Sequence, residues 1–158
     1  MNNIMIDHLL LVVLLLTKIN HQMNILNKSV TTSEPLSPSD SWTTIDELVI
    51  DLPNQELPTT VLGQLTIANF SFGSDVSNTY TFRLLLGTDV IAEVRFSDDA
   101  FPTGQNGIRN LPISFHGVGT YDRRTTQLKA EWMMQGTGNG QIPTPSMCTI
   151  SAILDTSD

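Results

Sequence analysis

The 158 residues suffice for one domain with a single core, and 40% of them are hydrophobic, as expected of a folded protein. Sixteen acidic and 8 basic side chains give a formal net charge of −8, and no basic cluster is larger than the pair Arg123–Arg124. This balance argues against nucleic-acid binding, which needs clustered cations, and the single cysteine, Cys148, excludes an intrachain disulfide.

The first 30 residues have a helical pattern of apolar residues. These residues recur at alternating intervals of four and three over more than three heptads, which is the seam of a helix that winds around copies of itself. We therefore predict an N-terminal α-helix over residues 1–30. Its predicted self-association residues are Met5, Leu9, Val12, Leu16, Ile19, Met23 and Leu26.

Residues 9–16, LLLVVLLL, are apolar all round such a helix, and a helix of this kind must be buried on every side. The residues outside the seam are predicted to dock into a partner protein: Leu10, Leu11, Val13, Leu14 and Leu15. A run of eight residues is short of the roughly 20 that span a membrane, and no basic residue precedes it as in a signal peptide. Two alternatives stay open: a membrane anchor, and a helix packed on its own β domain.

The Pro- and Ser-rich residues 31–43 predict a linker, and the period changes from 3.6 to 2 in residues 44–158. Apolar residues alternate with polar ones along 80–86, 90–96, 128–134 and 148–154, and further strands are predicted near 45–52, 61–72 and 111–118. A hairpin is expected to turn near Gly87. The predicted fold class is mainly β, an antiparallel jelly roll or β-sandwich of 7–8 strands preceded by the helix.

The segments TFRLLLGTDVIAEV and QLKAEWMM, with a last strand ending at Leu154, resemble the small jelly-roll modules of bacteriophage virion proteins. These modules occur in capsid decoration proteins, head fibres and tail-fibre tips, and their topology is similar to that of tumour-necrosis-factor and C1q domains. The resemblance covers residues 44–155 and implies a homotrimer. It carries no catalytic residues over to this chain.

No combination of residues indicates catalysis, a metal or another cofactor, so we expect a protein that is not an enzyme. His116 has no recognisable Ser or Asp partner and is interpreted as structural. Asp98 and Asp99 could bind calcium together with Asp75 or Asp89, but their spacing matches no known calcium loop.

The expected function is that of a structural virion protein, a capsid decoration, cement or head-fibre protein on the capsid surface or in a fibre. Its expected partners are itself, as a trimer, and the major capsid protein or another virion protein; nucleic acid and membrane are not expected. The alternative is a tail-fibre tip that binds a receptor or glycan through loops 97–110 and 135–146, with Tyr121, Trp132 or Phe101 stacking on a sugar. A membrane-anchored adhesin is a third possibility.

Overall fold

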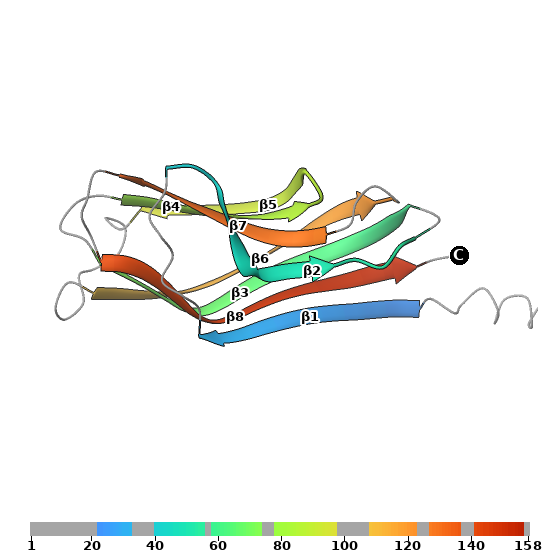
Figure 1. Cartoon of the computed structure of the whole chain (residues 1–158), viewed down its shortest axis with the longest axis horizontal. Coiled ribbons are helices and arrows are strands. Elements are labelled where there is room, and N and C mark those ends of the chain that lie inside the picture. The colour runs from blue at the N-terminus through green and yellow to red at the C-terminus, as the bar shows by residue number, and fades with distance from the viewer. Residues whose placement is uncertain are drawn as a thin grey trace, which may run out of the picture.

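The computed structural model describes residues 22–32, 40–55, 58–73, 78–97, 108–122, 127–136 and 141–156. These residues form two four-stranded antiparallel sheets, in the orders β1-β8-β3-β6 and β2-β7-β4-β5 (Figure 1). The strands are β1 (Gln22–Thr32), β2 (Thr43–Asp51), β3 (Thr59–Gly73), β4 (Asn78–Leu86), β5 (Asp89–Ser97), β6 (Ile108–Tyr121), β7 (Gln127–Gly136) and β8 (Gln141–Thr156). The prediction of a mainly antiparallel β protein is confirmed.

Each of the first four strands pairs with one of the last four. β1 pairs with β8, β2 with β7, β3 with β6 and β4 with β5, so the chain forms one long antiparallel ribbon. The ribbon then pairs with itself, because β8 also binds β3 and β7 also binds β4. The two sheets meet at both edges of the sandwich, where β1 lies beside β2 and β5 beside β6.

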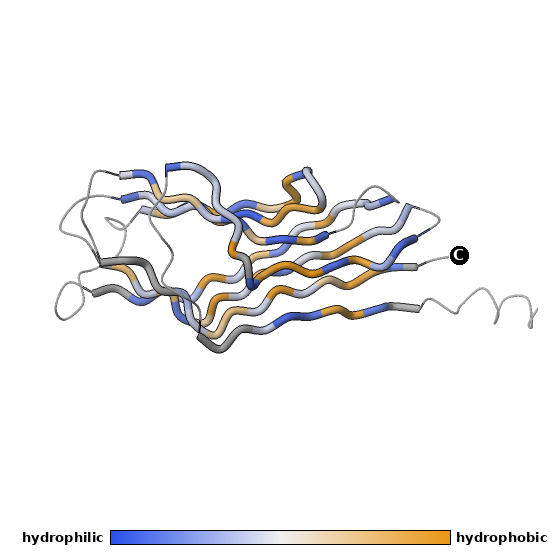
Figure 2. Tube along the Cα trace, in the orientation of Figure 1, coloured by the Kyte–Doolittle hydropathy of each residue, from blue (hydrophilic) through white to orange (hydrophobic). Residues whose placement is uncertain are grey.

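The core lies between the sheets and follows the predicted alternation. Leu128, Ala130 and Trp132 of β7 are buried, as are Ile150 and Ala152 of β8. Their neighbours along each strand face outward and are more polar, so hydrophobic and hydrophilic residues alternate along the traces in Figure 2. The inner faces of both sheets thus bury the apolar half of the chain, which is the main source of its stability.

Aromatic rings from both sheets fill one region of this core. Phe70 of β3 meets Phe82 of β4 edge to face, with 5.1 Å between the ring centroids, and also contacts Tyr80 at 5.4 Å. Phe96 of β5 stacks on Tyr80 at 5.5 Å. Such pairs are favourable beyond the area they bury, so they help to fix how the two sheets stack.

A bulge in β5 brings the two sheets into backbone contact. β5 shifts register against β4 between Leu84 and Leu85, and Ile91 is the extra residue that this shift leaves. The Ile91 side chain packs on the core, and the Ile91 backbone lies close to Gly117 of β6. A Cβ atom added to Gly117 would lie only 2.1 Å from the Ile91 carbonyl oxygen. Position 117 therefore accepts glycine alone, because any side chain would push β5 away from β6.

The predicted helix over residues 1–30 is wrong for residues 22–30, which lie in β1. Residues 1–21 lie outside the described residues, as do most residues of the predicted linker. β1 hydrogen-bonds along its length to β8, from Gln22 opposite Thr156 to Thr32 opposite Ser146. An edge strand needs few inward side chains, so apolar residues spaced by three and four are compatible with it. Pairing with β8 makes this segment a strand and not a helix.

We expect Gly117→Ala to lower the free energy of unfolding by about 3 kcal/mol, because the added methyl group overpacks the contact with Ile91. Equilibrium unfolding in urea, followed by tryptophan fluorescence, measures the change. Thr120→Ala is the matched control, since Thr120 lies on the same strand with its side chain exposed. Equal stability of the two variants would contradict the close approach of β5 to β6.

Candidate interaction surfaces

Most of the residues predicted to self-associate or to dock into a partner lie outside the described residues. This holds for Met5, Leu9, Val12, Leu16 and Ile19, and likewise for Leu10, Leu11, Val13, Leu14 and Leu15. Met23 and Leu26 lie on β1, and the Leu26 side chain packs against the core of its own sandwich. These two residues are therefore not part of a helical seam.

Two of the three aromatic residues predicted to stack on a sugar are not available for that role. Tyr121 and Trp132 each expose only 1% of their surface, and Phe101 lies outside the described residues. The Tyr121 hydroxyl donates a hydrogen bond to the Pro53 carbonyl oxygen at 3.3 Å, and burial raises the pKa of this hydroxyl. Tyr121 therefore ties the end of β6 to the segment that follows β2.

Three other predictions concern metals, histidine and membranes. Of the four candidate calcium ligands only Asp89 is described, and within the described ranges no three His, Cys, Asp or Glu residues are grouped to hold a metal ion. His116 lies exposed on the outer side of β6. The part of the chain that the structure describes contains no helix long and apolar enough to cross a membrane.

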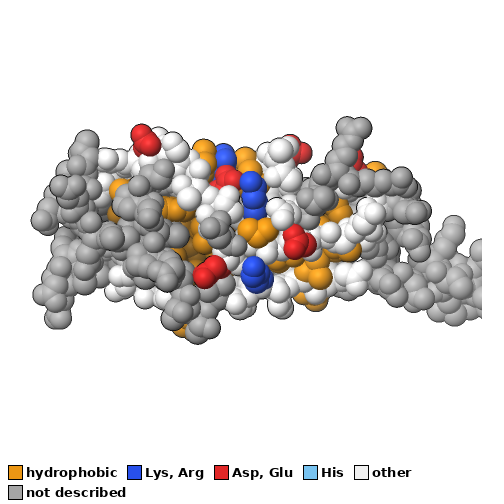
Figure 3. Space-filling model, in the orientation of Figure 1, with side chains coloured by type: hydrophobic (Ala, Val, Ile, Leu, Met, Phe, Trp, Pro, Cys, Tyr) orange, Lys and Arg blue, Asp and Glu red, His pale blue; other side chains and the backbone are white. Residues whose placement is uncertain are grey.

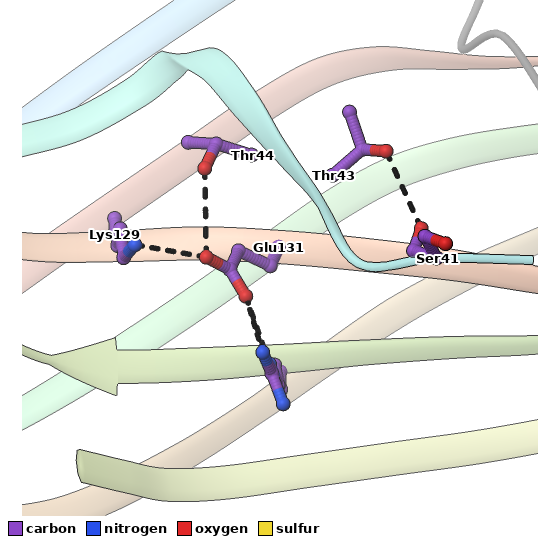
Figure 4. A network of polar contacts seen from close by, with 6 residues as sticks. Ser41, Thr43, Thr44, Lys129 and Glu131 are labelled. Carbon is purple, nitrogen blue, oxygen red and sulfur yellow. Dashed lines mark hydrogen bonds and ion pairs between the residues drawn. The ribbon is translucent and has the colours of Figure 1, made fainter. Parts of the chain in front are cut away.

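The outer face of the β2-β7-β4-β5 sheet carries a network of charged groups (Figure 4). Glu131 of β7 accepts hydrogen bonds from Arg83 of β4, at 2.9 Å from Nε and 2.6 Å from a terminal nitrogen. Lys129 Nζ lies 2.9 Å from the other carboxylate oxygen, to which the Thr44 hydroxyl also donates at 3.5 Å. The Trp42 ring covers the Arg83 guanidinium, whose carbon lies 3.7 Å from the ring centroid.

These partners keep the nearly buried Glu131 ionised. Burial by itself raises the pKa of this carboxyl group, but the hydrogen bonds and charges of Lys129 and Arg83 outweigh burial and lower the pKa below its ordinary value. Glu93 lies opposite Arg83 on β5, so charges of both signs follow one another across three strands. Figure 3 likewise shows Lys, Arg, Asp and Glu side chains close together on the side of the molecule where β2 and β7 lie.

The outer face of the β1-β8-β3-β6 sheet is of a different kind. One row of hydrophobic residues crosses all four strands, because Ile25 pairs with Ile153, Ile153 with Leu62, and Leu62 with Val118. We call these four residues the apolar row. Its two ends are among the most exposed large hydrophobic side chains described, Ile25 at 64% and Val118 at 61%.

Two rows of small polar residues lie next to the apolar row on the same face. Their members face outward on the four strands in turn: Asn27, Ser151, Gln64 and His116, then Ser29, Thr149, Thr66 and Ser114. Hydroxyl groups bridge neighbouring strands, at 3.1 Å between Ser29 and Thr149 and 3.2 Å between Thr66 and Ser114. The apolar row and these two rows, which we call the uncharged face, contain no Asp, Glu, Lys or Arg.

The sequence contains a signal for this face that the sequence analysis did not use. Leu62, Val118 and Ile153 stand at positions where the alternation of their strands calls for a polar residue. Hydrophobic residues that are out of phase on several strands indicate an outer surface meant for contact. That the three residues and Ile25 form one row became evident only from the strand pairing.

The sequence matches no protein-family model and no curated protein. Among solved structures, the chain is similar to the dimeric latent PorU of Porphyromonas gingivalis, with 10% identity, a TM-score of 0.49, and coverage of 87% of this chain and 13% of that one. It is also similar to infectious bursal disease virus VP2 in a subviral particle, with 11% identity, a TM-score of 0.45, and coverage of 87% and 33%. A third is the C-terminal CBM6 of LamC from Zobellia galactanivorans, with 13% identity, a TM-score of 0.34, and coverage of 80% and 98%. The chain spans a third or less of the first two.

We expect Glu131→Gln to lower the free energy of unfolding at pH 7 by about 2 kcal/mol, because the charged hydrogen bonds to Arg83 and Lys129 are lost. The pKa of Glu131 is lowered by folding, so its contribution is present above its ordinary pKa of 4.5 and disappears as the pH falls further. The stabilities of wild type and variant should therefore converge as the pH falls below 4.5.

Urea unfolding at a series of pH values measures this difference. Asp89→Asn, which also removes one carboxylate but at the exposed β4–β5 hairpin, is the matched control and should leave the free energy of unfolding at pH 7 nearly unchanged. A constant gap between Glu131→Gln and wild type from pH 7 to pH 3 would show that the ion pairs contribute nothing.

Proposed function

We propose that this protein is a non-enzymatic structural component of a virion, built on a jelly-roll domain. The observation that carries the proposal is the strand pairing. β1 pairs with β8, β2 with β7, β3 with β6 and β4 with β5, and the resulting ribbon is rolled into two sheets of four. This pairing supports the proposal, because an eight-stranded jelly roll requires it. Viral capsid proteins are among the main users of that fold, alongside lectin domains and cupins.

The surface supports a role in contact with other proteins. The uncharged face contains an exposed hydrophobic row flanked by hydroxyl and amide groups, a composition suited to a protein partner. Within the proposal, the protein decorates the capsid or forms part of a head fibre, and it contacts the major capsid protein. The residues proposed to take part in that contact are Leu10, Leu11, Val13, Leu14 and Leu15. The self-association expected from the heptad pattern loses part of its basis, since Met23 and Leu26 lie on β1.

Density-gradient purification of virus particles from the source of this sequence tests the proposal. The protein is expected to co-sediment with the particles in a constant ratio to the major capsid protein and to stay with them after a high-salt wash. Its presence only in the soluble fraction would contradict a virion role.

Two further readouts separate the proposal from its alternatives. Tight binding to assembled shells, with no binding on a glycan array, is expected for a decoration protein. Glycan binding without shell binding would instead favour a receptor-binding tip. Partition of the full chain into lipid vesicles would favour a membrane-anchored adhesin.

A further inference from the structure

We propose that the uncharged face of the β1-β8-β3-β6 sheet is the interface of a homodimer, in which it stacks on the same face of a second copy around a twofold axis. The inference starts from a contrast between the two outer faces. One carries the charged network around Arg83, Lys129 and Glu131, whereas the three rows of the other contain no charged residue.

The net charge of the protein favours an uncharged surface for contact with a second copy. At −8 each, two copies repel one another, and the repulsion is smallest where the facing surfaces carry no charge. A strongly acidic or basic partner would find no opposite charge on this face. A second copy, in contrast, offers the same hydrophobic row and the same small polar groups.

The order of the residues in each row makes the face complementary to itself. A twofold axis parallel to the strands, passing between β8 and β3, would place β1 of one copy over β6 of the other. Ile25 would then meet Val118 of the second copy, and Ile153 would meet Leu62. Two sheets stacked in this way keep their strands aligned, which is a usual arrangement for sheet packing.

The polar rows are compatible with the same axis. It would place Asn27 over His116 and Ser29 over Ser114 of the second copy. Hydroxyl and amide groups both donate and accept hydrogen bonds, so each polar row can form hydrogen bonds with the same row of the second copy. Asp155 of β8, in the row that flanks the apolar row, would meet Thr60 and not another carboxylate.

The size of the face indicates a dimer of moderate affinity. Four strands and four rows, with the flanking row included, span about 19 Å by 27 Å in projection. Specific interfaces bury about 600–1,000 Å² of accessible surface per partner, and this face reaches the lower part of that range once side-chain relief is added. We therefore expect a dissociation constant on the order of 1–100 µM.

Sedimentation equilibrium of the full chain, from about 5 to about 200 µM, tests the interface in the range where such a dimer dissociates. Wild type should pass from monomer to dimer, and Val118→Lys should raise the dissociation constant at least about tenfold by placing a charge against Ile25. Val90→Lys is the matched control, because Val90 is a valine exposed at 47% on β5 of the opposite sheet, and it should dimerise like wild type.

A covalent bridge tests the twofold arrangement itself. In the double variant Ile25→Cys and Val118→Cys, mild oxidation should give a disulfide-linked dimer on a non-reducing gel. The two positions are three strands apart in one chain, about 14 Å, which is too far for an intrachain bridge. The native Cys148 does not compete, since burial is the main factor that raises the pKa of its thiol to about 11. Ile25→Cys alone should give no covalent dimer, because the axis keeps the two copies of position 25 apart.

This interface would be overturned by a wild type that stays monomeric over the whole range or forms a trimer. Equal effects of Val118→Lys and Val90→Lys would overturn it as well, and so would the absence of a covalent dimer from the double variant. The inference does not rest on the virion role. A chain that dimerises through this face but is absent from particles would contradict only the proposed function.

Discussion

The antiparallel pairing of the first strand with the last is the interaction on which the rest of the structure depends. β1 and β8 are 109 residues apart at their nearest ends, from Thr32 to Gln141, and their pairing closes the ribbon whose inner members are β2–β7, β3–β6 and β4–β5. It places β1 at one edge of the sandwich beside β2, while the bulge of β5 on Gly117 closes the other edge. β1 also contributes Ile25, Asn27 and Ser29, so the uncharged face has its full width only because this pairing forms.

The two outer faces show how one alternating pattern gives two kinds of surface. On β7 and β4 the outward positions are occupied by Lys129, Glu131 and Arg83, whose charges compensate one another under Trp42. In the three rows of the uncharged face, the outward positions of β8, β3 and β6 carry Ser, Thr, Gln and His, with one Ile, Leu or Val per strand. A charged face stays in water and keeps copies apart, whereas a face without charge costs less free energy to desolvate. The proposed dimer follows from this difference.

Much of the fold could be predicted from the sequence, because period-two alternation reports directly on strands with one buried face. Residues 148–154 follow this rule, and the apolar residues predicted to point inward on 80–86 and 128–132 are buried. Gly87, with a φ of 64°, turns the predicted hairpin. Residues 22–30 were predicted wrongly as a helix. They form an edge strand that packs Leu26 against the core, and their period-two alternation is weaker than their heptad spacing. The alternation also predicted that the Ile91 side chain faces outward. It packs on the core instead, because a bulge shifts the register of β5 against β4, and such a bulge depends on the neighbouring strand. The apolar row escaped prediction for the same reason, as its members are brought together only by register.

The register of β1 on β8 can be measured directly by an intrachain disulfide. Ser29 and Thr149 lie opposite each other on the outer face, with their hydroxyl oxygens 3.1 Å apart. After mild oxidation of the double variant Ser29→Cys and Thr149→Cys, peptide mapping by mass spectrometry should find the two positions linked within one chain. The double variant Asn24→Cys and Thr149→Cys, displaced along the strands, should stay reduced. Linkage of positions 29 and 149 would establish the closed ribbon, whereas its absence, or equal linkage in the displaced pair, would contradict the structure on which both proposed roles rest.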